Sequence, residues 1–374
     1  MGYKSLLSLI AAVVLLPLAP VSNAQARGYL QHNLVSDKPA AAVADVTDPN
    51  LVNPWGIAFF PGGPFWISDN GAGVSTLYDG TGDIIPLTVT VPTPAGDTNP
   101  GAPGPSGMVW NGNPMAFPVG NNAGNSAPAL FIWATEDGTI AAWQGGLSPI
   151  TEAVTVVTNP HFVNGGTGTD PVYKGLAIGN NSSGLFLYAT NFRNGKIAVW
   201  DSTFSSTSTA AAALNAKFLD PKIPSGFAPF GIQNINGQLW VTYAQQDAAK
   251  HDPVPGKGEG FVDVFDTDGN LLRRFAQHGA LDAPWGIVLA PNNFGQFSND
   301  ILIGNFGDGK ISAWKPDTGK FVDWMRDAHD KTIELGTLWT LVFGGGTVSN
   351  PQTLYFTTGL VMEQDGLFGT LTPQ

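Results

Sequence analysis

Short apolar runs alternate with segments rich in Gly, Pro, Asn and Asp along almost the whole chain, a pattern typical of antiparallel strands joined by turns. Six of the runs open with Pro-x-Gly-aliphatic or a degraded copy of it, at Pro54, Pro105, Tyr173, Pro229, Pro284 and Leu338. Each copy is followed by a Gly with an aromatic residue or Leu five positions later, at Gly73, Gly138, Gly195, Gly260, Gly309 and Gly366. A further β-type run separates the two motifs in every unit. The chain is therefore built from six copies of one unit.

Each unit predicts a strand a at the first motif, a strand b, and a strand c at the second motif. A fourth strand, d, is predicted in the first five units at 84–91, 153–158, 216–219, 271–275 and 321–325. Four-stranded units repeated six times, at intervals of 49 to 68 residues, are the signature of a β-propeller. We therefore predict an all-β fold, a six-bladed β-propeller with four antiparallel strands per blade.

The sixth unit ends just after strand c, so its fourth strand has to come from elsewhere. The apolar segment Tyr29–Val35 is available, and pairing it with Leu367–Leu371 would close the ring and remove an open sheet edge. We predict that this N-terminal strand joins the last blade and that residues 25–374 form a single propeller domain.

The first 24 residues have the features of a secretory signal peptide. A short basic start precedes an apolar run from Leu6 to Ala19, and Ser22, Asn23 and Ala24 offer a cleavage site. This predicts a secreted or periplasmic protein without a membrane span after cleavage. The chain contains no cysteine, which excludes disulfides, thiolate catalysis and zinc bound by cysteine.

Composition narrows the class of partner. The formal net charge is −12, and only 12% of residues are charged. An acidic chain is a poor match for the phosphates of nucleic acids or for an anionic membrane surface. We expect a monomer that binds an extracytoplasmic ligand or protein and no nucleic acid.

The repeats resemble those of NHL-like six-bladed propellers. The whole chain after residue 24 resembles a family of uncharacterised exported bacterial propellers, on the strength of the segments Asn33–Asp37, Asp48–Ile57 and Ser68–Gly71. Some members of that family carry a C-terminal exosortase sorting tail; the sequence shows none, so surface sorting by that route is not expected. The resemblance implies the fold and export, and it assigns no activity.

Propeller geometry indicates where a site would lie. The d–a and b–c loops share one rim and include most of the long loops, so this d–a/b–c rim is the candidate functional face. Our candidate ligand-binding residues on it are Asp69, Asn70, Glu136, Asn191, Arg193, Tyr243, Asp247, His251, Asn305 and Glu363. Such a ring of carboxylates and amides could hold a structural or catalytic Ca²⁺. For Asn70, Asn191 and Asn305 a turn role is favoured, because they occupy equivalent positions in different units.

Two classes of function remain open. The first, which we favour, is a non-enzymatic scaffold that binds a ligand or protein through this rim. The alternative is a divalent-metal-dependent hydrolase or lyase of the gluconolactonase or streptogramin-lyase type, or one with a general acid–base pair, in which Asp247, His251 and Glu363 would take part. In gluconolactonase-type propellers, Asp or Asn at some x positions of Pro-x-Gly helps to bind the metal. No x residue here is a carboxylate or amide, and the five histidines show no paired spacing.

The bulky x residues have two interpretations. Trp55, Phe230, Trp285 and Trp339 could face the channel mouth and stack on a ligand, or they could pack between blades as core, which we favour. The insertion between Tyr243 and Glu259 is the best candidate for a lid.

Overall fold

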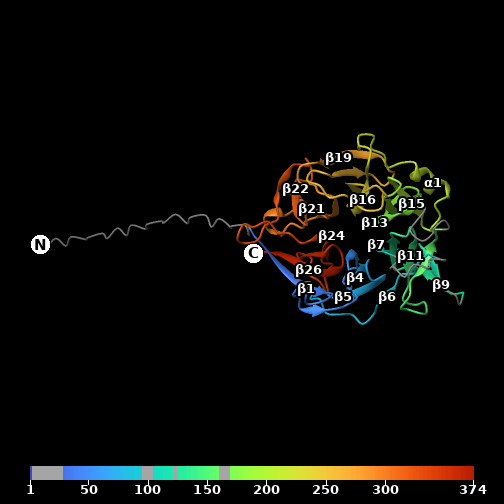
Figure 1. Ribbon diagram of the computed structural model, residues 1–374, viewed down its shortest axis with the longest axis horizontal. Helices are drawn as coiled ribbons and strands as arrows, with labels where there is room; N and C mark the ends of the chain where they lie inside the picture. Colours follow the sequence, from blue (N-terminus) through green and yellow to red (C-terminus); the bar gives the residue numbers. More distant parts are fainter. Residues whose placement is uncertain (2–27, 95–103, 122–123, 160–168) are drawn as a thin grey trace.

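The computed structural model describes residues 1, 28–94, 104–121, 124–159 and 169–374. Apart from Met1, the predicted signal peptide lies outside these residues. In the described residues, six antiparallel blades follow one another around a centre, and the last blade (red) meets the first segment of the chain (blue) in Figure 1. The predicted six-bladed β-propeller is confirmed.

The strands of each blade follow the predicted order, with strand a innermost. Blade 1 consists of β3 (Pro54–Ala58), β4 (Phe65–Asp69), β5 (Val74–Tyr78) and β6 (Val89–Thr90). Blade 2 consists of β7 (Pro105–Trp110), β10 (Phe131–Thr135), β11 (Ile140–Trp143) and β12 (Val154–Val157), and its a–b insertion carries a hairpin of β8 (Pro118–Gly120) and β9 (Ser126–Pro128). Blade 3 consists of β13 (Tyr173–Asn181), β14 (Gly184–Asn191) and β15 (Lys196–Asp201).

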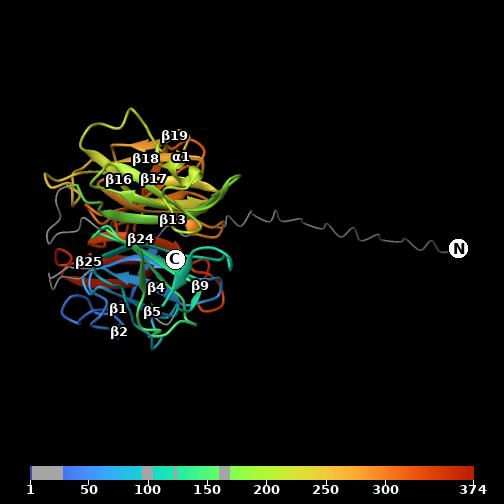
Figure 2. The same ribbon diagram turned by 90° about the vertical axis from the view of Figure 1, so that its right-hand side faces the viewer.

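The second half of the chain builds the other three blades, and the strands of blade 4 lie beside one another in Figure 2. Blade 4 consists of β16 (Phe227–Ile235), β17 (Gln238–Gln245), β18 (Phe261–Phe265) and β19 (Leu271–Gln277). Blade 5 consists of β20 (Pro284–Leu289), β21 (Ile301–Asn305), β22 (Ile311–Trp314) and β23 (Phe321–Trp324), with the 3₁₀ turn η1 (Gly295–Phe297) between β20 and β21. Blade 6 consists of β24 (Thr337–Phe343), β25 (Leu354–Leu360), β26 (Asp365–Pro373) and β1 (Tyr29–Ser36), with β2 (Val46–Thr47) parallel to β1.

The glycine of the repeated tetrapeptide is explained by the approach of neighbouring inner strands. A Cβ on Gly107 would lie 2.3 Å from the backbone nitrogen of Leu176 in the next blade. A Cβ on Gly231 would lie 2.2 Å from the carbonyl oxygen of Trp285. Only a residue without a side chain fits where two backbones come this close. The glycine therefore recurs because each blade packs closely on the next.

The ring closes as the sequence predicts. β1 pairs antiparallel with β26, from Tyr29 opposite Pro373 to Ser36 opposite Leu367. The Tyr29 hydroxyl is buried and donates to the carbonyl of Phe294 at 3.0 Å, so the closing strand is also anchored to blade 5. Hydrogen bonds thus join the two ends of the propeller and leave no open edge between its first and last blades.

Blade 3 departs from the prediction, since no strand forms at 216–219 in this fully described segment. The chain instead forms helix α1 (Thr209–Asn215), capped by the Ser208 side chain. The side-chain amide of Asn215 then pairs with both backbone groups of Val199 on the edge of β15, at 2.9 Å each. One amide replaces part of a strand ladder, which is why the predicted fourth strand of this blade was wrong.

The bulky x residues meet one another at the centre of the ring. Trp55 stacks on Trp339 with ring centroids 3.5 Å apart, and Trp285 approaches both rings edge-on. Phe192 after β14 and Phe306 after β21 join these x residues, and we call the whole set the aromatic plug: Trp55, Phe192, Phe230, Trp285, Phe306 and Trp339. All six side chains are buried. The preferred interpretation, that these side chains are buried in the core, is confirmed. However, they meet at the centre of the propeller, where Trp55 and Trp285 come from non-adjacent blades, rather than packing only between adjacent blades.

Among the described residues, no helix has the length and apolar character needed to cross a membrane.

Candidate functional site

Polar side chains from five blades meet above the aromatic plug on the d–a/b–c rim. They come from the segment before β3, from the turns after β4, β10 and β25, from the start of β13 and from the loop after β17. We call them the Lys174 cluster: Asn53, Asn70, Glu136, Lys174, His251, Asp252 and Glu363. The rim chosen from sequence is the rim on which these groups gather.

Lys174 is the centre of the cluster. It is the x residue of the third tetrapeptide, and its side chain is only 1% exposed. Its Nζ donates to Glu136 Oε1 and, at 3.2 Å, to Asp252 Oδ1. The ammonium also lies 5.1 Å from the centre of the Trp55 ring, a cation–π distance. Burial alone would lower the pKa of Lys174, but the charges of Glu136 and Asp252 outweigh it and raise that pKa, so the lysine is a cation.

A chain of hydrogen bonds runs from Glu136 back to the plug. Asn70 Nδ2 donates to Glu136 Oε2 at 2.8 Å, and the Asn53 amide donates to Asn70 Oδ1 at 3.4 Å. The indole Nε1 of Trp339 donates to Asn53 Oδ1 at 3.1 Å. These contacts fix which end of each amide is the donor, so Asn70 is more than a turn residue.

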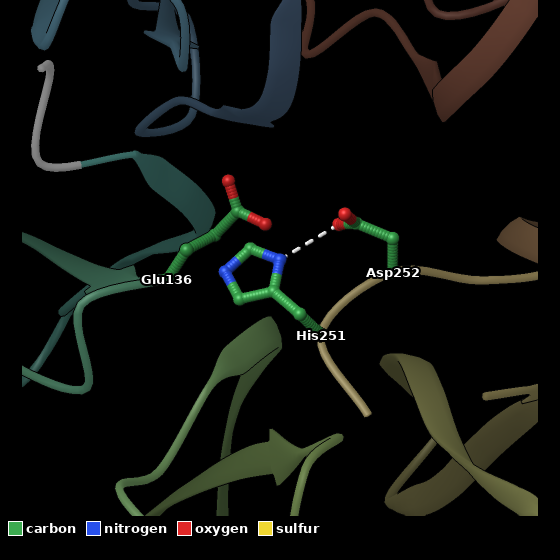
Figure 3. Close-up of side chains that lie close together, drawn as sticks. All are labelled: Glu136, His251 and Asp252. Carbon is green, nitrogen blue, oxygen red and sulfur yellow. Dashed lines mark hydrogen bonds and ion pairs between the residues drawn. The ribbon is translucent and has the colours of Figure 1, made fainter. Parts of the chain in front are cut away.

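The loop after β17 places a His–Asp pair against Glu136. His251 Nδ1 lies 2.8 Å from Asp252 Oδ1, and Figure 3 shows the imidazole between the carboxyl groups of Glu136 and Asp252. Asp247 shapes this loop, since its Oδ1 accepts the backbone N–H of His251 at 2.7 Å. Burial would raise the pKa of Asp252, but the hydrogen bond from His251 and the charge of Lys174 lower it well below its usual range. The predicted lid segment therefore supplies part of the cluster.

Glu363 joins the cluster from a turn with strained backbone. Val361, Met362 and Glu363 have φ values of 49°, 53° and 66°, the longest run of non-glycine residues in the left-handed region among the described residues. Each such residue costs on the order of 1 kcal/mol or more. Glu363 Oε2 accepts from Asn53 Nδ2 at 3.0 Å. Burial raises the pKa of Glu363 to about 7, and the carboxylate of Glu136 acts in the same direction.

The structure brings Asn70, Glu136, His251 and Glu363 together, with Asp247 supporting them, and the other five candidates lie elsewhere. Their side chains have these surroundings: Asp69 Oδ2 accepts from Thr76, Asn191 Oδ1 accepts turn amides, Arg193 donates to the Asp170 carbonyl, Tyr243 is buried against Asp263, and Asn305 Nδ2 donates to Ala280 and Asp308. These contacts stabilise turns and strands, as proposed for the equivalent asparagines Asn191 and Asn305.

Three members of the cluster were not among the sequence candidates. Asp252 follows a chosen residue, and Asn53 precedes a tetrapeptide at φ 47°, a value that asparagine tolerates. Lys174 is the missed residue with the clearest signal, because it is the one charged residue at the six x positions. Once those positions point inward, a lysine there must be buried and paired.

A divalent cation is a poor fit to this arrangement. Glu136, His251 and Asp252 each offer one ligand atom, and these atoms lie within 4.8 Å of one another. However, Glu136 Oε1 and Asp252 Oδ1 both already accept hydrogen bonds from Lys174. A metal ion on the same oxygens would face a buried ammonium at close range. The residues do not fit a resident Ca²⁺, so we derive no chemistry through one.

Comparison with solved structures shows the propeller fold alone. A glucose dehydrogenase matches with a TM-score of 0.53 and 13% identity over 86% of this chain and 96% of its own. The soluble aldose sugar dehydrogenase of Escherichia coli matches with a TM-score of 0.50 and 13% identity, over 92% of this chain and 100% of its own. A virginiamycin B lyase from Staphylococcus aureus matches with a TM-score of 0.48 and 14% identity, over 92% of this chain and 98% of its own. Identities this low carry no activity across.

Comparison with sequences identifies a relative that covers most of the chain. The chain matches none of the protein-family models with which it was compared. It is 30% identical over 328 residues to uncharacterized protein R648 of Acanthamoeba polyphaga mimivirus, a match that covers 87% of this chain and 76% of R648. The predicted bacterial family and export stay predictions. At this identity and coverage, the chain belongs to the family of mimivirus protein R648.

Proposed function

We propose that this protein is a ligand-binding propeller whose site is the Lys174 cluster on the d–a/b–c rim. The ligand is a small polar molecule with hydrogen-bond donors or a positive charge. The single observation that carries the proposal is Glu363, a largely buried carboxylate presented on a strained turn. Among the described residues it has one hydrogen bond, from Asn53, and no ion pair.

Charge balance supports the ligand class. Lys174 supplies one positive charge, whereas Glu136 and Asp252 supply two negative charges and Glu363 a third once it ionises. The cluster therefore has excess negative charge, which a donor-rich or cationic ligand would offset. Because these charged groups are attached to separate blades, the rigid propeller fixes their positions relative to one another.

A second function is favoured by one observation, the pKa of Glu363 near 7 in the cluster that also holds the His251–Asp252 pair. A carboxyl group with this pKa can accept or donate a proton at neutral pH, which is what general acid–base catalysis requires. The enzymatic alternative is then a metal-free hydrolase or lyase that uses Glu363 and His251. On a substrate of such an enzyme, Glu363→Gln would abolish turnover and leave binding within a few-fold of wild type.

A thermal-shift screen tests the binding proposal. The probes are agmatine and spermidine as organic cations, glucose as a neutral polyol and citrate as an anion. We expect stabilisation of the wild type by a cation or polyol, which is lost in Glu363→Gln and in His251→Ala. Glu152→Gln, at an exposed glutamate in the c–d loop of blade 2 and outside the cluster, is the matched control and should keep the effect. A stabilising probe that works equally well on Glu363→Gln would show that the site lies elsewhere.

We also propose that the protein is exported, on the evidence of its first 24 residues. N-terminal sequencing of protein recovered outside the cytoplasm should begin at Gln25. An intact Met1 on that protein would contradict cleavage.

A further inference from the structure

The oxygens that a metal ion would use at the channel mouth already surround a cation, the ammonium of Lys174. Its Nζ lies against Glu136 Oε1 and 3.2 Å from Asp252 Oδ1, with the imidazole of His251 beside both carboxyl groups in Figure 3. These three residues are the group among the described residues whose ligand atoms lie within 4.8 Å of one another.

We infer that Lys174 is a built-in counter-ion that keeps divalent metals from the centre of this propeller, and that its removal converts Glu136, His251 and Asp252 into a site for a transition-metal ion. The inference does not depend on the proposed ligand. It concerns what holds the carboxyl groups together when no ligand is bound.

The surroundings of the ammonium favour a lysine over a hydrated ion. Below Nζ lie the faces of Trp55 and Phe192, with ring centres at 5.1 and 5.9 Å. An alkylammonium can rest on aromatic faces through its cation–π attraction, and the lysine stem packs against apolar surface. A divalent cation at this depth would need water or oxygen ligands on the same side, which the two rings do not provide.

The remaining ligand set suits a transition metal once the lysine is gone. One imidazole and two carboxylates form a donor set that Mn²⁺ and Zn²⁺ accept. Ligand atoms about 2.1 Å from a metal are at most about 4.2 Å apart, so a separation of up to 4.8 Å requires a movement of only a few tenths of an ångström. Lys174→Ala removes the competing charge and leaves room for the ion and its waters.

The experiment measures Mn²⁺ binding by electron paramagnetic resonance, with the metal alone as probe. We expect wild-type protein to bind no Mn²⁺ at this site at 1:1 stoichiometry and to melt at the same temperature with MnCl₂ or EDTA. Lys174→Ala should bind one Mn²⁺, and its melting temperature should rise by several degrees with the metal. The double variants Lys174→Ala/His251→Ala and Lys174→Ala/Glu136→Gln should lose at least tenfold in Mn²⁺ affinity.

Three outcomes would overturn the inference. Wild-type protein that binds one Mn²⁺ with an affinity reduced by Glu136→Gln would show that the metal displaces Lys174. A folded Lys174→Ala variant that binds no Mn²⁺ would show that the three residues do not form a site. If Lys174→Ala is unfolded without metal, we expect it to refold in MnCl₂. The inference is contradicted if Lys174→Ala does not refold in MnCl₂ although the double variant Lys174→Ala/Glu136→Gln is folded.

Discussion

Two ion clusters in this propeller are each built around a largely buried cation, and they differ in their exposure and in their number of carboxyl groups. In the Lys174 cluster a lysine holds Glu136 and Asp252, and in blade 4 Arg274 holds Asp220 and Asp263. Each cation also lies over an aromatic ring, Lys174 over Trp55 at 5.1 Å and Arg274 over Phe261 at 5.0 Å. Each is one cation between two carboxylates, a self-contained way to bury charge.

The two clusters differ in solvent exposure, and the Lys174 cluster contains one more carboxyl group. Asp220 and Asp263 are 2% and 0% exposed, whereas Asp252 is 62% exposed and His251 is 37% exposed. Glu363 adds a third carboxyl group to the Lys174 cluster without adding a cation. The Arg274 cluster is closed, and its two carboxylates both pair with its one cation. The Lys174 cluster is open and unbalanced, which is the condition for binding something from solution.

A raised pKa does not distinguish the two clusters. Burial raises the pKa of Asp263 to about 6 although the charge of Arg274 opposes it. Burial also raises the pKa of Glu363, to about 7, although the charge of Lys174 and the hydrogen bond from Asn53 oppose it. Perturbed carboxyl groups thus occur at structural and candidate functional sites alike. Exposure and the count of charges separate the two.

The largest expected effect is the loss of either central cation. Lys174→Met and Arg274→Met each leave two carboxylates without their partner and should lower the free energy of unfolding by about 3 to 5 kcal/mol. Chemical denaturation at pH 7 measures this loss. Adding Glu136→Gln to Lys174→Met should restore part of the stability, because it removes one unpaired charge. A cost under 1 kcal/mol for Lys174→Met would mean that the cluster is solvated.

Neutralising Glu363 should have a smaller effect on the free energy of unfolding, and one of opposite sign. Glu363 binds its proton more tightly in the folded state, so its contribution to stability is complete below pH 4.5 and is lost as the pH rises to about 7. Glu363→Gln should therefore raise the free energy of unfolding at pH 8, by about 1 to 3 kcal/mol, and flatten its pH dependence between 4.5 and 7.

The matched change in the other cluster is Asp263→Asn. It removes a partner of Arg274, so it should lower the free energy of unfolding at pH 8 by about 1 to 3 kcal/mol. Urea titrations at pH 5 and pH 8 measure both variants. Equal signs for Glu363→Gln and Asp263→Asn at pH 8 would remove the distinction between the clusters.

The smallest effect concerns the strained turn that carries Glu363. Val361 is 60% exposed and has a φ of 49°, which is costly for a β-branched residue. Val361→Gly should relieve this strain and raise the free energy of unfolding by about 0.5 to 1 kcal/mol after the entropy lost by glycine. Thermal unfolding checks the gain. A destabilised Val361→Gly would show that the valine side chain contributes more than its strained backbone costs.

Most of the fold could be predicted because the repeat encodes backbone contacts. The tetrapeptide glycines sit where neighbouring inner strands nearly touch, so they recur in five of the six blades, and Thr340 takes this position in blade 6. The closing strand was predictable because an unpaired sheet edge had one apolar segment available. The fourth strand of blade 3 was not, because Asn215 satisfies the edge of β15 through its side chain.

The site could be predicted only in part. Propeller geometry gave the rim, and loop residues such as His251 and Glu363 followed from it. The same reasoning also selected Asn191 and Asn305, whose amides serve turns, because a turn and a ligand site use the same residue types. Lys174 was missed because its role depends on where the inner strand points and on partners 38 and 78 residues away. The sequence shows a charged residue at an x position, but it does not show which carboxylates that residue holds.

The most direct test of the central claim is the titration of Glu363 itself. ¹³C NMR of protein with labelled glutamate side chains, with Glu363→Gln to assign the resonance, gives the midpoint of its ionisation. An unbalanced, binding-competent cluster predicts a midpoint near 7, moving downward when a stabilising cation is added. A midpoint between 4 and 5 that no cation shifts would show that Glu363 is an ordinary solvated carboxylate, and the cluster would then be structural.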